Sequence, residues 1–360
     1  MAGCDVSEVA RSGVSIRGGK RHRIVSNDVR ETGNAGIAVS GGVKSTLESS
    51  GHEILNNDVS RAANDFPEPA IQVGIGEASQ ILGKAVGIRV AHNRIHDSAN
   101  AGIRFGGADN LFEFNEIYRI GLNSGYCGYC GFGNVVRNNF VYHSMNGNAF
   151  YMDDGTSGIT VSGNVAYKCA MGVLMGGGHY NRFLNNIIID CPRGIHLDDR
   201  GVSRKYTLGD TAYGKDVDSV SPVHSPWKEK YPELATLVAG GDTTVPKGDE
   251  VIGNIVINSK TPFEFPKQDT ATGITQRGNV TNTSTVDFVD AENLDFTLRP
   301  GSTLVASIPG FPAIPFHEIG LQVDEYRKSI PSRDMKLLRE GNTSKRKFSS
   351  TTDIEASNRK

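Results

Sequence analysis

The sequence contains no long run of apolar residues. No stretch approaches the about 18 uninterrupted apolar residues that a membrane-spanning helix needs. It also lacks an excess of charge of either sign, because 38 basic residues stand against 40 acidic ones. This balance argues against binding to nucleic acid or to a membrane surface. The N-terminal segment has no apolar core of the kind that a secretory signal requires, so no signal peptide is visible and the cellular location stays open.

Cysteine and tryptophan are scarce. The chain has five cysteines and one tryptophan. An odd number of thinly spread cysteines does not form a disulfide framework. Cys127 and Cys130 form a lone CxxC motif. Because no second pair accompanies it, we interpret this motif as structural and expect neither a metal nor a cofactor there.

Glycine, in contrast, is abundant. It supplies 43 of the 360 residues, well above the usual frequency of about 7%, and it does not follow the third-residue period of collagen. Abundant glycine between short apolar segments predicts many turns that join short strands. A helix bundle is excluded.

An internal repeat sets the expected fold. Asparagine, followed two residues later by an apolar or small residue, recurs along the chain, and the four intervals between Asn93 and Asn186 are 22, 24, 25 and 22 residues. Longer intervals elsewhere indicate a repeat with an inserted loop. The repeated asparagines are Asn27, Asn57, Asn93, Asn115, Asn139, Asn164, Asn186 and Asn254.

A second element runs in phase with these asparagines. Short alternating segments such as Gly36–Val39, Gly102–Phe105 and Gly194–Leu197 begin with glycine and are rich in apolar residues. Strands this short at this spacing stack in parallel, about 4.8 Å apart, rather than form hairpins. The sequence therefore predicts an all-β fold, a right-handed parallel β-helix built as a single-stranded solenoid. A leucine-rich-repeat solenoid is disfavoured because the LxxLxL spacing is missing.

Two cysteines provide a check on this register. Cys169 and Cys191 each lie five residues after the asparagine of their own rung. We expect them to stack one rung apart in the interior, as a ladder and not as a disulfide.

The chain divides into five segments on this interpretation. Because Val9–Ile16 already resembles a rung and no polar capping segment precedes it, we expect an N-terminal truncation. The segments are rungs over residues 1–199, an inserted loop with a short helix over 200–250, the last rungs over 251–292, a proline-rich segment over 293–326 that caps the solenoid by packing along it, and a disordered tail over 327–360.

Two pairs of acidic residues end strand-like segments two rungs apart. Asp153 and Asp154 form one pair, and Asp198 and Asp199 form the other. The rung between them carries three glycines at 176–178, which we expect to leave an open trough between the carboxylates. Two rungs separate the pairs by roughly 9 to 10 Å. That separation is close to the roughly 6.5–9.5 Å of inverting glycosidases, so one carboxylate is expected to act as acid and the other as base.

Other polar residues are expected to bind substrate around these acids. His196 alternates with apolar residues and is expected to face outward, and His179 follows the three glycines. Alternatives stay open, because acidic residues at solenoid corners also serve as ordinary solvated turns and suit calcium as ligands. The predicted substrate-binding residues are Asp153, Tyr151, His179, His196, Asp199 and Arg200.

The same residues carry a resemblance to a known family. Residues 87–322 resemble bacterial right-handed β-helix repeat proteins of the pectin-lyase-like fold, closest to the β-helical glycoside hydrolases that act on fucosides and xylan. The runs that carry it are Tyr151–Gly158, Gly176–His179, Asn185–Ile187, Ile195–Asp198, Arg200–Gly201, Pro226–Trp227, Tyr231–Leu234 and Phe311–Gly320. The resemblance implies that Asp154 and Asp198 are the acid and the base and that members are exported. Asp199 departs from the small residue more common in the family.

Three functions remain from the sequence. The first is a glycoside hydrolase that acts on a plant-type or algal-type polysaccharide without a cofactor. The second is a polysaccharide lyase, in which Arg182, Arg193 and Arg200 neutralise a uronate and the aspartates hold Ca²⁺. The third is a non-catalytic solenoid that binds glycans. The sugar, the linkage, the endo or exo mode and the oligomeric state do not follow from the sequence.

Overall fold

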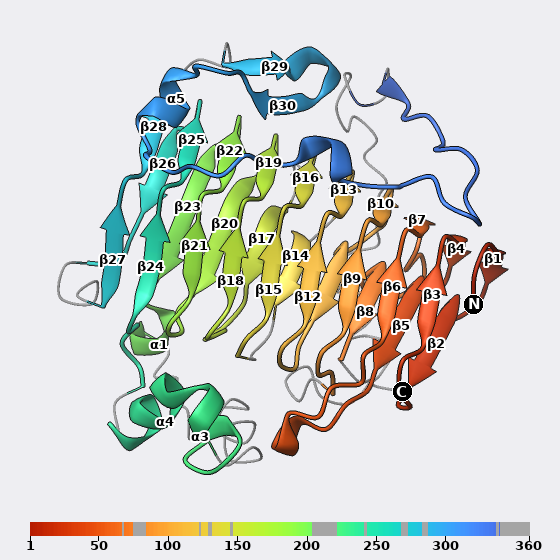
Figure 1. The fold of residues 1–360 in the computed structure, drawn as a ribbon, viewed down its shortest axis with the longest axis horizontal. Helices are drawn as coiled ribbons and strands as arrows, with labels where there is room; N and C mark the ends of the chain where they lie inside the picture. The colour runs from red at the N-terminus through yellow and green to blue at the C-terminus, as the bar shows by residue number, and fades with distance from the viewer. Residues whose placement is uncertain are drawn as a thin grey trace, which may run out of the picture.

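A computed structural model provides the structure of the protein. It describes residues 1–66, 68–74, 84–121, 124–128, 132–144, 147–203, 222–240, 243–267, 273–282, 287–335 and 338. Within this part of the chain, three parallel sheets stack into an elongated solenoid whose rungs advance from the N-terminal end (Figure 1). The predicted all-β parallel β-helix is confirmed.

The three sheets run along the length of the solenoid, and within the described residues they contain ten, nine and nine strands. The first sheet comprises β1 (Asp5–Val9), β4 (Asp28–Thr32), β7 (Asp58–Ser60), β10 (Arg94–His96), β13 (Glu116–Tyr118), β16 (Phe140–Tyr142), β19 (Val165–Tyr167), β22 (Ile187–Ile189), β25 (Ile255–Ile257) and β28 (Val280–Asn282). The second comprises β2 (Val14–Arg17), β5 (Ile37–Ser40), β8 (Ile71–Val73), β11 (Ile103–Phe105), β14 (Ser124–Gly128), β17 (Asn148–Met152), β20 (Met171–Gly176), β23 (Arg193–Asp198) and β26 (Thr261–Glu264). The third comprises β3 (Arg23–Val25), β6 (Glu53–Leu55), β9 (Arg89–Ala91), β12 (Leu111–Glu113), β15 (Val135–Arg137), β18 (Thr160–Ser162), β21 (Arg182–Leu184), β24 (Asp249–Ile252) and β27 (Ile274–Arg277).

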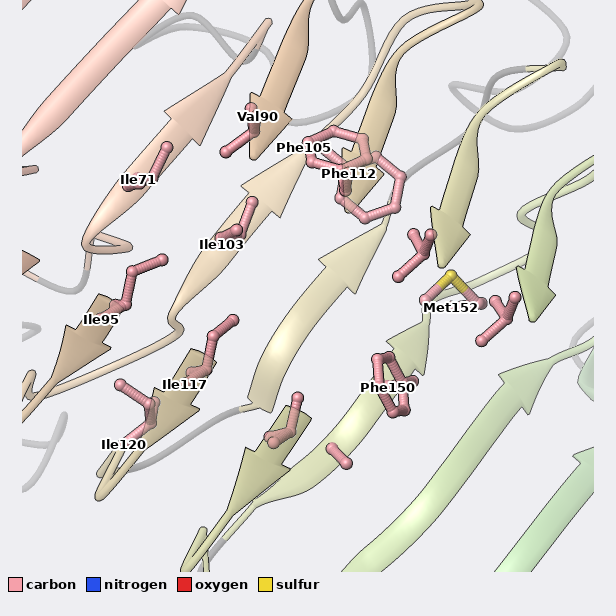
Figure 2. Close-up of a cluster of buried hydrophobic side chains, with 14 of the residues drawn as sticks. Ile71, Val90, Ile95, Ile103, Phe105, Phe112, Ile117, Ile120, Phe150 and Met152 are labelled. Carbon is pink, nitrogen blue, oxygen red and sulfur yellow. The ribbon is translucent and has the colours of Figure 1, made fainter. Parts of the chain in front are cut away.

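The apolar core fills the interior of the coil. Strands of all three sheets alternate, so one set of side chains points inward and the next points outward. Ile103 of the second sheet, Phe112 of the third and Ile117 of the first are at most 1% exposed and meet in the interior (Figure 2). Burying each such side chain stabilises the fold by about 1.5–3 kcal/mol.

The asparagine ladder is present as predicted. The backbone N–H and the side-chain amide of Asn115 both donate to Oδ1 of Asn139, at 2.9 and 3.0 Å, and Asn139 makes the same pair of bonds to Asn164. Each side chain thus satisfies a buried donor of the rung before it. Asn279 extends the ladder by one rung beyond the asparagines found in the sequence.

A second polar ladder was not predicted. Asn110 donates to Oδ1 of Asn134 at the turn before the third sheet. Farther along, Asn181 donates to Oδ1 of Asp249 through both its backbone N–H and its side chain. Burial raises the pKa of Asp249 to about 8, although the bonds from Asn181 oppose that rise.

The cysteine ladder is confirmed. Cys169 and Cys191 are both free and fully buried, and the backbone N–H of Cys169 lies 3.4 Å from Sγ of Cys191. Corner glycines hold the same register, since a Cβ on Gly194 would lie 2.2 Å from the carbonyl oxygen of Pro262 in the next rung.

A helical insert leaves the solenoid after β23. It contains α1 (Arg200–Ser203), α3 (Trp227–Lys230) and α4 (Pro232–Ala239), and the rungs resume at β24. Trp227 is 2% exposed, and its indole N–H donates to the carbonyl of Lys44 at 2.8 Å. Lys44 belongs to the 3₁₀ helix η1 (Lys44–Thr46), so the insert is fixed against the loop that follows β5.

The C-terminal segment returns along the outer face of the first sheet (Figure 1). It covers apolar side chains of that face, including Tyr142 and Ile189, with its own Phe296 and Leu304. Its elements are β29 (Phe288–Asp290) antiparallel to β30 (Asp295–Leu298), α5 (Thr303–Ala306), and the 3₁₀ helices η2 (Ala291–Asn293) and η3 (Phe316–Glu318).

The expected disordered tail is wrong for residues 327–335. Arg327 is 7% exposed and pairs with Asp28 at 2.7 Å, and Arg333 pairs with Glu116, which is fully buried. The low apolar content of this stretch suggested disorder, but ionic contacts fix it instead. None of the helices in the described ranges is long and apolar enough to span a membrane.

Candidate functional site

The two acidic pairs emerge from the outer face of the second sheet, as expected. Tyr151 of β17 is in register with Leu174 of β20, which is in register with His196 of β23. Asp198 ends β23 opposite Gly176, and Asp153 directly follows β17. The acids therefore lie one strand to either side of β20.

Arg200 occupies the space between the acids. Its Nη2 lies 2.7 Å from Asp198, and its Nη1 lies 2.7 Å from Asp154 and 3.5 Å from Asp153. A Cβ on Gly176 would lie 2.7 Å from Cζ of Arg200. The glycines were expected to leave an open trough, and this is wrong: the missing side chain makes room for a guanidinium.

The bonds of Arg200 are unequal. It contacts both oxygens of Asp198 through Nε and Nη2, and its own backbone N–H also donates to that carboxylate. Toward Asp154 a single bond from Nη1 is present. Asp154 is also the most exposed of the three acids, with 31% of its side chain accessible against 23% for Asp198 and 18% for Asp153.

Asp198 is held ionised. Burial alone would raise its pKa, but hydrogen bonds from His196 and Arg200 outweigh that effect and lower the pKa to about 2. The same carboxylate, with Asp154, keeps the pKa of Arg200 above its ordinary value despite burial. At neutral pH, Asp198 is therefore suited to accept a proton and not to donate one.

Tyr151 and Asp153 support the cluster. The Tyr151 hydroxyl donates to Oδ1 of Asp153, which also accepts from the backbone N–H of Asp154. Burial and the neighbouring Asp153 raise the pKa of Tyr151 above its ordinary value. Asp153 is thus a fixed carboxylate that orients the residue following it.

His196 extends the cluster toward the next rung. It lies on the outer face, with Nε2 3.7 Å from Asp198 and Nδ1 2.8 Å from Glu264 of β26. Arg193 also pairs with Glu264, and this bond lowers the pKa of that carboxyl. Glu264 was not found from the sequence, because it lies 66 residues beyond Asp198 across the insert. Only its register with His196 could have indicated it.

Two other residues do not meet the predicted roles, and substrate binding by a third, Asp199, stays a prediction. His179 is 3% exposed, and its two ring nitrogens contact the backbone of Thr243 and Lys247, so the expected substrate contact is wrong. Asp199 directly precedes α1, and its carbonyl accepts from the backbone of that helix. Arg182 lies on the third sheet, paired with Glu250, and cannot join this cluster.

Metal ligands are not gathered in the described ranges. Among these residues, no group of three or more His, Cys, Asp or Glu side chains lies close enough together to hold a metal ion. Of the CxxC motif, the Cys127 side chain and Cys130 lie outside the described part of the chain.

Part of the chain matches a known protein family, and its fold is similar to that of a solved structure. Residues 74–209 match the family described as "Right handed beta helix region". No curated protein matches the chain. Among solved structures, one similar fold is that of a mannuronic acid specific polysaccharide family 6 lyase enzyme from human gut microbiota, with a TM-score of 0.40, 10% identity, and coverage of 87% of this chain and 83% of that chain. The three parallel sheets give the chain a parallel β-helix fold, and the part of it over residues 74–209 matches the right-handed β-helix family.

Proposed function

We propose that the protein is an inverting glycoside hydrolase that cleaves a neutral polysaccharide, with Asp198 as base and Asp154 as acid. The observation that carries the proposal is the contact of one guanidinium with both carboxylates. Two hydrogen bonds and a guanidinium between them limit the separation of their nearest oxygens to about 8 Å. This upper limit lies inside the roughly 6.5–9.5 Å typical of inverting enzymes, and it supports inversion.

The unequal bonds of Arg200 support the two roles. Asp198 is ionised in the resting state and takes a proton from water as the water attacks the anomeric carbon. Asp154, which receives fewer bonds from Arg200 than Asp198 does, is the acid whose charge can change when a glycan enters and Arg200 stays with Asp198. It gives its proton to the leaving oxygen, and proton exchange with solvent after turnover reprotonates Asp154 and removes from Asp198 the proton that it took from water.

The charge of the cluster supports a neutral substrate. Around the two catalytic acids stand further carboxylates, Asp153, Asp199 and Glu264, against the cations Arg193 and Arg200. An excess of negative charge repels a polyuronate. The lyase alternative is weaker for a second reason: Arg193 and Arg200 are already engaged by carboxylates, and Arg182 lies on another sheet.

The test compares carboxylate-to-amide variants on soluble xylan, a fucosylated glycan and a polyuronate. Release of reducing ends from a neutral polysaccharide by the wild type should fall about 10²–10⁴-fold in Asp154→Asn and in Asp198→Asn. Glu250→Gln on the third sheet serves as the matched control, and we expect it to keep the wild-type rate. Full activity in either aspartate variant would refute the assignment. Products that absorb in the ultraviolet would indicate a lyase, and retention without cleavage would indicate a binding module.

A further inference from the structure

A cavity lies on the same outer face of the second sheet, near the N-terminal end. Its volume is about 650 Å³, and its floor is formed by β2, β5 and β8. The outward side chains of the floor are small or polar: Ser15, Ala38 and Gln72 are in register, as are Arg17 and Ser40. Small side chains over three successive rungs leave a groove that runs across the strands, along the solenoid.

One wall of this groove carries two acceptors that lack donors. Among the described residues, Oδ1 of Asn34 and an Oε2 of Glu68 are buried without a hydrogen-bond partner, and both residues line the cavity. Each lies three residues before its strand, and because Ile37 pairs with Ile71, the two occupy equivalent positions in successive rungs. The two residues are therefore about 4.8 Å apart along the solenoid, measured between their backbones.

Buried acceptors without donors are costly, at about 1–3 kcal/mol each. Two such acceptors in repeating positions indicate a ligand that presents donors at a similar spacing. Sugar hydroxyl groups donate and accept, so they match both this wall and the serine and glutamine side chains of the floor.

The opposite wall is preorganised. It contains residues 41–43 and Glu48, and Lys20 pairs with Glu48 across it. Val43 and Glu48 exchange backbone hydrogen bonds at 2.9 and 3.1 Å. The loop between them is fixed by the indole of Trp227, so the helical insert supports the groove from outside. A wall held in this way costs little to order on binding.

The charge of the lining is nearly balanced. Three cationic side chains, Arg17, Lys20 and Lys84, face two anionic ones, Glu48 and Glu68. A balanced lining suits a neutral glycan better than a polyuronate.

We propose that this groove is a binding site for a neutral polysaccharide chain, the same chain that the acidic cluster cleaves. In the second sheet, β11 and β14 lie between β8 and β17, so the groove and the cluster are about 15 Å apart along one face. Only the claim that the bound polysaccharide is also the substrate of the acidic cluster rests on the proposed function. Binding at the groove stands on the cavity and its acceptors.

The experiment measures retention of the purified protein in native gels that contain soluble xylan, a β-glucan, a galactomannan or a polyuronate. All variants carry Asp198→Asn so that the polysaccharide is not cleaved. Ala38→Tyr fills the floor of the groove and should weaken retention by a neutral polysaccharide at least tenfold. Ser162→Tyr places the same side chain on the outer face of the third sheet and should change retention less than twofold.

A gentler variant protects the test against misfolding. Glu68→Ala removes one acceptor without adding bulk and should weaken retention at least threefold, with a thermal unfolding midpoint that is not lowered. Polysaccharide binding at the groove would be refuted by either of two results. One is retention of both groove variants equal to that of the control, and the other is no retention of the Asp198→Asn protein by any neutral polysaccharide. If the groove variants weaken retention but the wild type releases no sugar, polysaccharide binding at the groove is supported and the proposed hydrolase activity is refuted. Cleavage that is lost in Asp198→Asn but unchanged in Ala38→Tyr would support the hydrolase and refute polysaccharide binding at the groove.

Discussion

The role of Arg200 could not be read from the sequence. The sequence placed Asp154, Asp198 and the glycines in the correct rungs, because strand register follows from repeat spacing. It gave no information on where the Arg200 side chain points, since that depends on a turn after β23 and on the absent side chain at Gly176. For the same reason His179, predicted to contact substrate, is buried by a segment that returns 64 residues later.

Removing the Asp198 carboxylate should lower stability in a pH-dependent way. Its folded pKa of about 2 lies below the ordinary value of 3.8, so its contribution is present above pH 4 and is lost as the pH falls toward 2. We expect Asp198→Asn to lose about 2 kcal/mol of unfolding free energy at pH 7 and almost nothing near pH 2. Urea unfolding followed by circular dichroism at both pH values checks this. An equal loss at both would show that the carboxylate charge is not the cause.

At the level of the structural elements, the sequence predicted one of the two polar ladders and missed the other. The Asn115–Asn139–Asn164 ladder was evident because one residue type recurs at nearly constant intervals. The ladder that joins Asn181 to Asp249 was hidden, because the residue type changes and the insert separates its members. The ionic anchoring of residues 327–335 was missed because its partners lie some 200–300 residues earlier.

A single ladder asparagine should carry a large stability cost. Asn139→Ala removes the acceptor of two buried N–H groups of Asn115, its backbone N–H and one N–H of its side-chain amide, which still donates to the carbonyl of Val90. At about 1–3 kcal/mol for each donor, the unfolding free energy should fall by about 2–6 kcal/mol. Thr160→Ala, on the outer face of the third sheet, is the control and should stay within about 0.5 kcal/mol of the wild type. Similar urea midpoints for the two variants would contradict a structural role for the ladder.

At the scale of the whole molecule, a mutation that destabilises the helical insert should leave the stability of the solenoid unchanged. Each rung contacts only its neighbours, so damage at one edge spreads little along the stack. The insert reaches the solenoid through Trp227, which packs against Ala108 and Phe132 and binds the Lys44 carbonyl.

Truncating that anchor tests the separation. Trp227→Ala should remove about 3–5 kcal/mol of packing and loosen residues 222–240, which then keep the contacts of Lys230 and Tyr231 with Asp109 and Phe132. Hydrogen exchange followed by mass spectrometry should show faster exchange in 222–240 and unchanged protection in β17, β20 and β23. Equal loss of protection in those strands would mean that the insert stabilises the whole coil.

The stereochemistry of cleavage tests the account most directly, because the spacing of Asp154 and Asp198 fixes the outcome. Proton NMR of the first product formed from a neutral oligosaccharide reports its anomeric configuration before mutarotation. With Asp198 activating water across a gap of at most about 8 Å, the new reducing end should have the anomeric configuration opposite to that of the cleaved bond. Retention of configuration would contradict the acid–base pair that Arg200 holds apart.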